Sequence, residues 1–177
     1  MTAIVGFVHK RKVYIGGDTA TCCGWDVASH REPKVFRVGA MLFGFSGDVR
    51  ASQVLRYGFR PPPLPDGEES ERYLATGFAD ALRDCLKGAG CAQKDGDRER
   101  SEAYFLLGWR GRLFRFHGDY SFTESADGFD ACGCGGPYAL GALHAARGKP
   151  ADRVLVALKA AERFSAGVRG PFVVECT

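Results

Sequence analysis

Short apolar runs, separated by glycine, proline and charged residues, are the main pattern in this chain. They are rich in β-branched and aromatic residues and come in pairs with short polar connections, which predicts antiparallel hairpins. The paired runs cover residues 3–8 with 12–17, 35–38 with 41–45, and 104–109 with 112–116. Two weaker strands are predicted near Tyr120 and Phe129, and a closing strand over 171–176.

Helical periodicity of apolar residues occurs in two pairs of segments. The four segments cover residues 48–59, 71–87, 137–147 and 150–164. Ser46 or Asp48 can cap the first helix, and Gly88 can end the second. Pro137 suits the first turn of the third, and Pro150 or Asp152 starts the fourth. The remaining stretches 18–32 and 93–102 show neither pattern, so we expect loops there.

This order of elements indicates the fold class. Strands and helices do not alternate, which argues against a doubly wound parallel sheet. Two antiparallel sheets, each with a helix pair on its outer face, would use every amphipathic segment. We therefore expect an α+β fold, a four-layer αββα sandwich. The 177 residues suit one domain, so we expect a single domain over residues 1–177.

Composition and charge narrow the class of protein. Hydrophobic residues make up 45% and charged residues 25%, which is typical of globular proteins and unlike disordered chains. The apolar runs are shorter than the about 20 residues of a membrane span. The basic HKRK at residues 9–12 follows an apolar segment, the reverse of an export signal. We interpret HKRK as a turn and expect neither nucleic-acid nor membrane partners.

Seven cysteines, an odd number, favour a reduced, cytoplasmic protein. Cys22-Cys23 and Cys132-x-Cys134 raise the possibility of a zinc site. Their spacings differ from those of zinc-binding cysteine pairs, so we predict no metal and no organic cofactor.

The candidate chemistry begins at Thr2. Removal of Met1 would leave Thr2 with a hydroxyl and a free α-amine. Such an amine has an ordinary pKa of about 7.7–8.0, so it can act as general base toward its own hydroxyl. Two strands of similar length, rising about 3.3 Å per residue, return Asp18 to the end of the sheet where Thr2 lies. Lys34 stands just before the next predicted strand.

Three parts of the sequence together resemble a known family. Residues 1–18, MTAIVGFVHKRKVYIGGD, resemble the start of a proteasome β-subunit and, more closely, of its simpler bacterial homologue. These proteins are N-terminal nucleophile (Ntn) hydrolases, with a threonine, an acidic residue 16 positions later and a lysine 16 positions after that. Thr2, Asp18 and Lys34 have this spacing. GFSG at 44–47 and CGCGGPYALGAL at 132–143 also resemble family segments.

The resemblance implies a threonine-type peptidase or amidohydrolase. Thr2 would attack a peptide or amide carbonyl, with its α-amine as general base. Lys34 would lower the pKa of that amine, and Asp18 would hold Lys34. The backbone N–H of Gly47 would stabilise the oxyanion. Cys134 stands where the family has a supporting serine.

The resemblance also implies partners. We expect a homo-oligomeric ring that acts on peptide or amide substrates, with an ATPase unfoldase as a possible partner if stacked rings enclose the sites. Phe45 aligns near the base of the family's specificity pocket, although a core aromatic is an equally good interpretation.

Two departures from the family leave an alternative open. Cys134 replaces the serine, and residues 164–172 contain no acidic residue, with Ser165 as the only hydroxyl. The alternative is a catalytically silent, proteasome-like scaffold or shell subunit, in which a retained Met1 would block the amine of Thr2.

Overall fold

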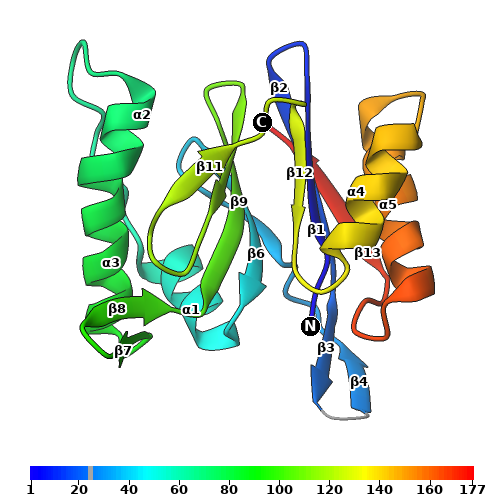
Figure 1. The fold of residues 1–177 in the computed structure, drawn as a ribbon, viewed down its shortest axis with the longest axis horizontal. Coiled ribbons are helices and arrows are strands. Elements are labelled where there is room, and N and C mark those ends of the chain that lie inside the picture. Colours follow the sequence, from blue (N-terminus) through cyan, green and yellow to red (C-terminus); the bar gives the residue numbers. More distant parts are fainter. Residues whose placement is uncertain (24–25) are drawn as a thin grey trace.

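Two antiparallel β-sheets stand side by side in the computed structural model, which describes residues 1–23 and 26–177 (Figure 1). The first sheet contains, in spatial order, β12 (Phe129–Cys132), β1 (Ile4–His9), β2 (Lys12–Asp18) and β13 (Phe172–Cys176). The second contains β11 (Phe122–Glu124), β10 (Arg112–Phe116), β9 (Ala103–Trp109), β6 (Met41–Gly47) and β5 (Val35–Val38). The predicted antiparallel α+β character is thus confirmed.

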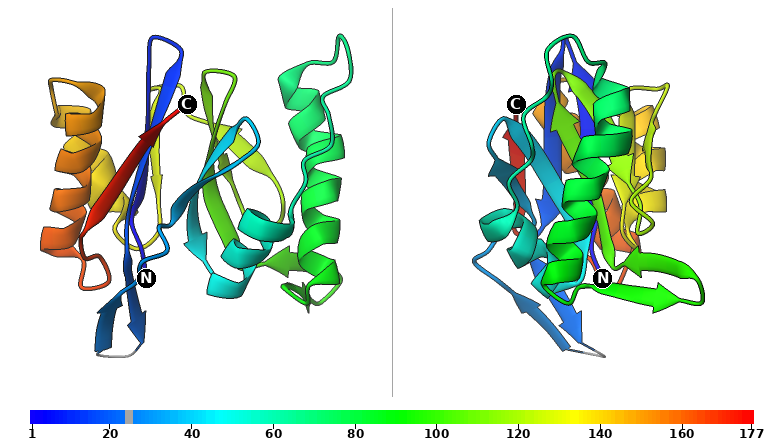
Figure 2. Two further views of the ribbon diagram at one scale, coloured as in Figure 1. Left: turned by 180° about the vertical axis from the view of Figure 1, so that it is seen from behind. Right: turned by 90° about the vertical axis from the view of Figure 1, so that its left-hand side faces the viewer.

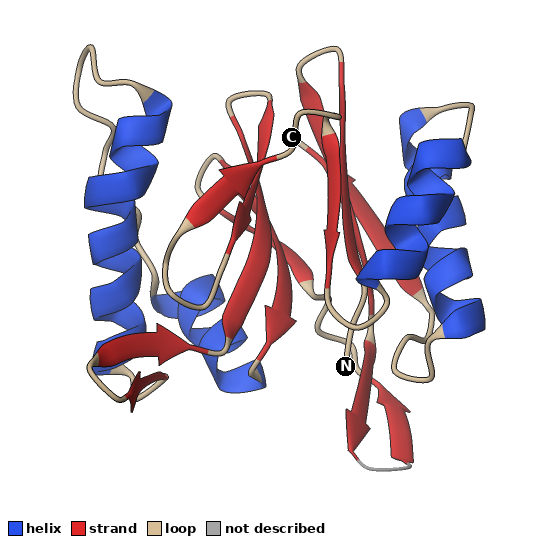
Figure 3. Cartoon of the chain, in the orientation of Figure 1, coloured by secondary structure: helices blue, strands red, loops and turns tan. Residues whose placement is uncertain are grey.

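Helices cover the outer face of each sheet (Figures 2 and 3). Beside the second sheet lie α1 (Val49–Gln53), the π-helical turn η1 (Val54–Gly58), α2 (Ser70–Tyr73), the π-helical turn η2 (Leu74–Phe78) and α3 (Ala79–Gly88). Beside the first lie α4 (Gly136–Ala145) and α5 (Pro150–Phe164). The four predicted helical segments are therefore present, and two of them contain a π turn that apolar spacing did not predict.

The two sheets pack through branched aliphatic side chains. The buried cluster between them includes Ile4, Ile15, Leu42 and Leu106. Gly44 of β6 makes close packing possible, since a Cβ there would lie 2.4 Å from the Ile4 Cγ2 and 2.5 Å from the Ile15 Cγ2. Because Gly44 has no side chain, β6 can lie close to the N-terminal hairpin of β1 and β2.

Aromatic side chains fill the space between the second sheet and its helices. The rings of Phe105 and Phe116 are stacked 4.8 Å apart, and Phe78 of η2 lies 5.2 Å from Phe116. The space between the first sheet and α4–α5 is filled instead by smaller residues, including Val5, Ala139, Ala157 and Leu158.

The two predicted loops contain hairpins, so the loop prediction was wrong for the described residues of both. They are β3 (Ala20–Cys23) with β4 (Asp26–Ser29), and β7 (Ala92–Asp95) with β8 (Arg98–Ser101). Residues 24–25 of the first loop lie outside the described part. Both hairpins lie apart from the two main sheets, so they lack the apolar alternation that marks a buried strand.

Ion pairs hold the second of these hairpins to the helix layer. Glu99 of β8 lies 2.7 Å from Arg83 and 3.1 Å from Lys87 on α3. The hydrogen bond from Lys87, followed by that from Arg83, lowers the pKa of Glu99 from its ordinary value. In the part of the chain that is described, no helix combines the length and apolar character needed to cross a bilayer.

Candidate active site

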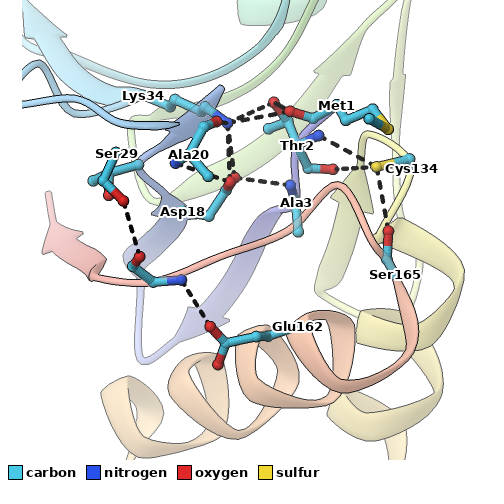
Figure 4. Close-up of polar contacts among 12 residues, drawn as sticks. Met1, Thr2, Ala3, Asp18, Ala20, Ser29, Lys34, Cys134, Glu162 and Ser165 are labelled. Atoms are coloured by element: carbon cyan, nitrogen blue, oxygen red, sulfur yellow. Dashed lines mark hydrogen bonds and ion pairs between the residues drawn. The ribbon is translucent and has the colours of Figure 1, made fainter. Parts of the chain in front are cut away.

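Thr2 lies just before β1, at the end of the first sheet (Figure 4). It is 5% exposed, whereas Met1 is 58% exposed. The turn after β12 holds it, because the backbone N–H of Gly135 donates to the Thr2 carbonyl over 3.1 Å. The structure therefore fixes the position of Thr2 by main-chain contacts that do not involve its hydroxyl.

Asp18 ends β2 and is completely buried. The pairing of Ile4 with Gly17 in the β1–β2 hairpin brings Asp18 back to Thr2, as the strand lengths predict. Its Oδ1 accepts a hydrogen bond from the Ala3 N–H over 3.0 Å, and its Oδ2 accepts one from the Ala20 N–H over 3.3 Å. Two backbone donors thus hold the carboxylate in a single orientation.

Lys34 connects Asp18 to Thr2. Its Nζ lies 3.0 Å from both Asp18 oxygens and 2.8 Å from the Thr2 Oγ1. It also donates to the Ala20 carbonyl over 2.5 Å. The Lys34 side chain is 17% exposed. A buried carboxylate needs such a partner, since an isolated charge inside a protein is strongly disfavoured.

Cys134 lies on the opposite side of Thr2 from Lys34 (Figure 4). Its Sγ accepts a hydrogen bond from the Thr2 backbone N–H over 3.3 Å and lies 3.4 Å from the Ser165 Oγ. The thiol also donates to the Thr2 carbonyl over 3.5 Å. Cys134 therefore contacts the nitrogen that would become the α-amine, and Ser165 contacts the sulfur of Cys134.

Glu162 is the second acidic side chain drawn in Figure 4, and it hydrogen bonds to the backbone that follows Ser165. Glu162 of α5 accepts a hydrogen bond from the Gly170 N–H over 2.9 Å. It thereby fixes the segment that carries Ser165 and does not hydrogen bond to Thr2.

Gly47 closes β6 at the same end of the molecule. Its φ is +143°, and a Cβ there would lie 1.7 Å from the Glu102 carbonyl oxygen, so only glycine fits. Gly47 lines a pocket of about 230 Å³ together with Thr2 and Lys34. The structure therefore brings the five predicted site residues together. Lys34 and Cys134 hydrogen bond to Thr2, Asp18 hydrogen bonds to Lys34, and Gly47 lines the same pocket as Thr2 and Lys34.

The remaining pocket wall comes from places that sequence reasoning missed. Thr21 and His30 come from the β3–β4 hairpin region, and Arg56 and Tyr57 come from η1. Neither segment carries a motif, so only their position identifies them. Phe45 is both a core aromatic and a pocket residue, because it is only 3% exposed and also lines the pocket.

The zinc hypothesis rests partly on Cys22 and Cys23, whose side chains lie outside what the structure describes. Among the side chains that are described, no group of three His, Cys, Asp or Glu residues could hold a metal ion.

No family model matches this chain, but its fold has well-matched counterparts among solved structures. Thiobacillus denitrificans BPH is 23% identical with a TM-score of 0.82, over 99% of this chain and 97% of that one. Eukaryotic HslV from Trypanosoma brucei is 20% identical with a TM-score of 0.65, over 98% of both chains. The chain has a proteasome-like fold.

The proteasome-like counterparts also include Anbu from Hyphomicrobium sp. strain MC1, as a Gly-1 mutant. It is 20% identical with a TM-score of 0.67, over 100% of this chain and 82% of that one. At these identities the likeness is one of fold. This likeness of fold agrees with the resemblance to proteasome β-subunits seen in the sequence.

Proposed function

We propose that this protein is a threonine-type peptidase or amidohydrolase of the Ntn class, built as one domain on a four-layer αββα sandwich. Cleavage of the peptide bond before Thr2 would free the α-amine. The observation that carries the proposal is the 2.8 Å contact between the Lys34 Nζ and the Thr2 Oγ1, with buried Asp18 behind Lys34. A cation directed at a buried hydroxyl suits a nucleophile better than a structural threonine.

The reaction uses the two ends of Thr2. The Thr2 Oγ attacks the substrate carbonyl, the α-amine takes the hydroxyl proton, and the oxygen–carbon bond forms. The C–N bond then breaks as the amine passes this proton to the leaving nitrogen, which leaves an ester on Thr2. Water hydrolyses the ester and restores the hydroxyl. The positive charge of Lys34 favours the neutral, basic form of the amine.

Two further groups complete the proposed site. The Gly47 backbone N–H stabilises the oxyanion, a contribution of about 2.7–4 kcal/mol where a single donor has been removed. The Cys134 Sγ, which lies 3.3 Å from the Thr2 nitrogen, accepts a hydrogen bond from the amine and keeps its lone pair directed at the hydroxyl.

The pocket beside Thr2 suggests the class of substrate. Phe45, Val49 and Tyr57 give it apolar surface. We propose a peptide or small amide with an apolar group next to the bond that is cleaved. Thiobacillus denitrificans BPH, which has the same fold, has also been solved in complex with epoxomicin.

The proposal extends to assembly and location. The chain would form a homo-oligomeric ring in the cytoplasm and would require neither a metal nor an organic cofactor. If the rings stack and enclose the sites, an ATPase unfoldase would supply unfolded chains. Light scattering tests this version directly, and a stable monomer would exclude an enclosed protease.

One observation favours a second function, a catalytically silent scaffold. With Met1 in place, its carbonyl accepts hydrogen bonds from the Thr2 Oγ1 over 2.5 Å and from the Lys34 Nζ over 3.3 Å. In this state both the nucleophile and the cation are occupied, and the nitrogen of Thr2 is an amide without basicity.

Mass-mapped covalent labelling separates the two functions. We expect intact mass to show loss of Met1, and a peptide vinyl sulfone or epoxomicin to label Thr2. Thr2→Ala abolishes labelling, whereas Thr76→Ala, on an exposed helical surface, leaves it unchanged. Retention of Met1 in all molecules supports the scaffold, and labelling at Cys134 overturns Thr2 as the nucleophile.

A further inference from the structure

The backbone on both sides of the Lys34 side chain is held by hydrogen bonds. The Lys34 carbonyl accepts from the Phe45 N–H over 2.8 Å, which ties it to β6. The Pro33 carbonyl, one peptide earlier, accepts from the Arg56 Nη2. The Arg56 side chain therefore supplies the hydrogen bond on the N-terminal side of Lys34.

The Arg56 guanidinium itself packs against aromatic rings. Its Cζ lies 4.6 Å from the ring centre of Phe36 and 5.9 Å from that of Tyr57. A planar guanidinium can stack on a ring and donate hydrogen bonds in a fixed fork, whereas a lysine ammonium is a compact point charge without that geometry. Phe36 is 6% exposed and belongs to the core, so Arg56 is anchored to a rigid part of the molecule.

Arg56 belongs to the helical segment that starts beside the proposed oxyanion donor. Asp48, directly after Gly47, caps α1 by accepting from the Arg50 N–H over 2.9 Å. The chain then enters η1, where the Phe59 N–H donates to the Val54 carbonyl over 3.0 Å. Single π turns are frequent at functional sites, because they shift side chains around the helix axis.

We propose that Arg56 is a positioning residue, which fixes the Pro33–Lys34 peptide and so the distance of the Lys34 ammonium from Thr2. The four-carbon stem of a lysine is flexible, so its two ends need separate anchors. Asp18 and the Ala20 carbonyl hold the ammonium of Lys34, and the hydrogen bonds to the Pro33 and Lys34 carbonyls hold its backbone. The inference rests on the proposed function for its kinetic consequence, since the reaction it affects is that of Thr2. A misplacement of about 1 Å costs on the order of 100-fold in rate.

The test compares the labelling of processed Thr2 by a peptide vinyl sulfone in three variants. Arg56→Met keeps the length of the side chain but removes the donor and the charge, and Arg56→Lys keeps the charge without the planar guanidinium. Arg50→Met, on the exposed face of α1, is the matched control for lost charge.

We expect Arg56→Met to lower the maximal labelling rate about 10- to 100-fold, in addition to any change in the half-saturating concentration that follows from the altered pocket wall. The acid limb of its pH–rate profile moves to higher pH, because a more distant Lys34 no longer lowers the pKa of the amine. Arg56→Lys shows the same loss of rate, and Arg50→Met shows none. Full rescue by Arg56→Lys contradicts the proposal and assigns the effect to charge alone.

Crystal structures provide a readout that does not depend on reactivity. We expect the Lys34 Nζ to move away from the Thr2 Oγ1 in Arg56→Met while Asp18 stays in place. An unmoved Lys34 together with wild-type labelling overturns the role of Arg56. An unreactive wild-type protein with free Thr2, in which Arg56→Met still displaces Lys34, overturns only the proposed function.

Discussion

Lys34 is the residue on which the local electrostatics of the site depend. Its Nζ contacts both oxygens of Asp18, which is completely buried. Breaking a buried pair leaves one charge without compensation, which costs more than the pair itself contributes. The same residue therefore affects stability and, in the proposed function, reactivity.

Lys34→Met separates these two effects. We expect a loss of about 3–5 kcal/mol in the free energy of unfolding, measured by urea denaturation, because Asp18 stays buried without its partner. Adding Asp18→Asn removes that charge and restores much of the stability. Labelling of Thr2 stays absent in the double variant, and wild-type stability of Lys34→Met alone would contradict the ion pair described here.

Cys132, at the end of β12, and Cys134, in the turn after it, differ in their surroundings. Burial raises the pKa of the Cys132 thiol to about 12, whereas Cys134 is exposed. We expect iodoacetamide at pH 8 to modify Cys134 and spare Cys132 in the folded protein, as read by peptide mapping. Both react after denaturation in urea. In processed protein, modification of Cys134 also blocks the labelling of Thr2, because the added group lies against its nitrogen.

At the scale of elements, the hairpins show where sequence patterns succeed and where they fail. β1 and β2 were predicted because their apolar residues face buried layers on both sides of the sheet. β4 was missed because all four of its residues are exposed. Alternation of apolar and polar residues arises because one face of a strand is buried, so an exposed strand does not show it. Backbone hydrogen bonds do not depend on residue type and cannot be recognised from the sequence.

Gly44→Ala tests the packing of one sheet on the other. We expect a loss of about 1–3 kcal/mol in the free energy of unfolding, because the new methyl group would overlap Ile4 and Ile15. Gly88→Ala, where a Cβ meets nothing within 4 Å, is the matched control and stays within about 0.5 kcal/mol of wild type. Equal unfolding midpoints for the two variants would contradict the packing described between the sheets.

At the scale of the whole molecule, the buried thiol of Cys132 links stability to pH. Between its ordinary pKa of 9.0 and about 12, the unfolded chain releases the thiol proton while the folded chain keeps it. The unfolded state then binds fewer protons, so stability falls as pH rises. The stability that depends on this thiol is fully present below pH 9.0 and is lost above it.

Cys132→Ala measures this linkage. We expect the difference in unfolding free energy between wild type and variant to shrink from pH 8 to pH 11, by at most about 1.4 kcal/mol per pH unit. Urea denaturation at several pH values gives the measurement. A difference that stays constant with pH would mean that the thiol is accessible to solvent in the folded protein.

The sequence by itself determined the N-terminal hairpin and the return of Asp18 to Thr2, and the resemblance to proteasome β-subunits added Lys34 to this pair. The lengths of the two strands and the short turn between them determine where Asp18 lies, and these lengths can be counted in the sequence. It placed the strand over residues 41–45, whereas in the structure β6 continues to Gly47. These contacts span few elements, so patterns in the residues are enough to place them.

Only the tertiary structure decided what surrounds Thr2. Cys134 is 132 positions away and reaches the Thr2 nitrogen because β12 pairs with β1. Arg56 reaches Pro33 from a π-helical turn that the spacing of apolar residues did not predict. Such neighbours depend on how sheets and helices pack across the molecule, and packing depends on the summed shapes of many side chains.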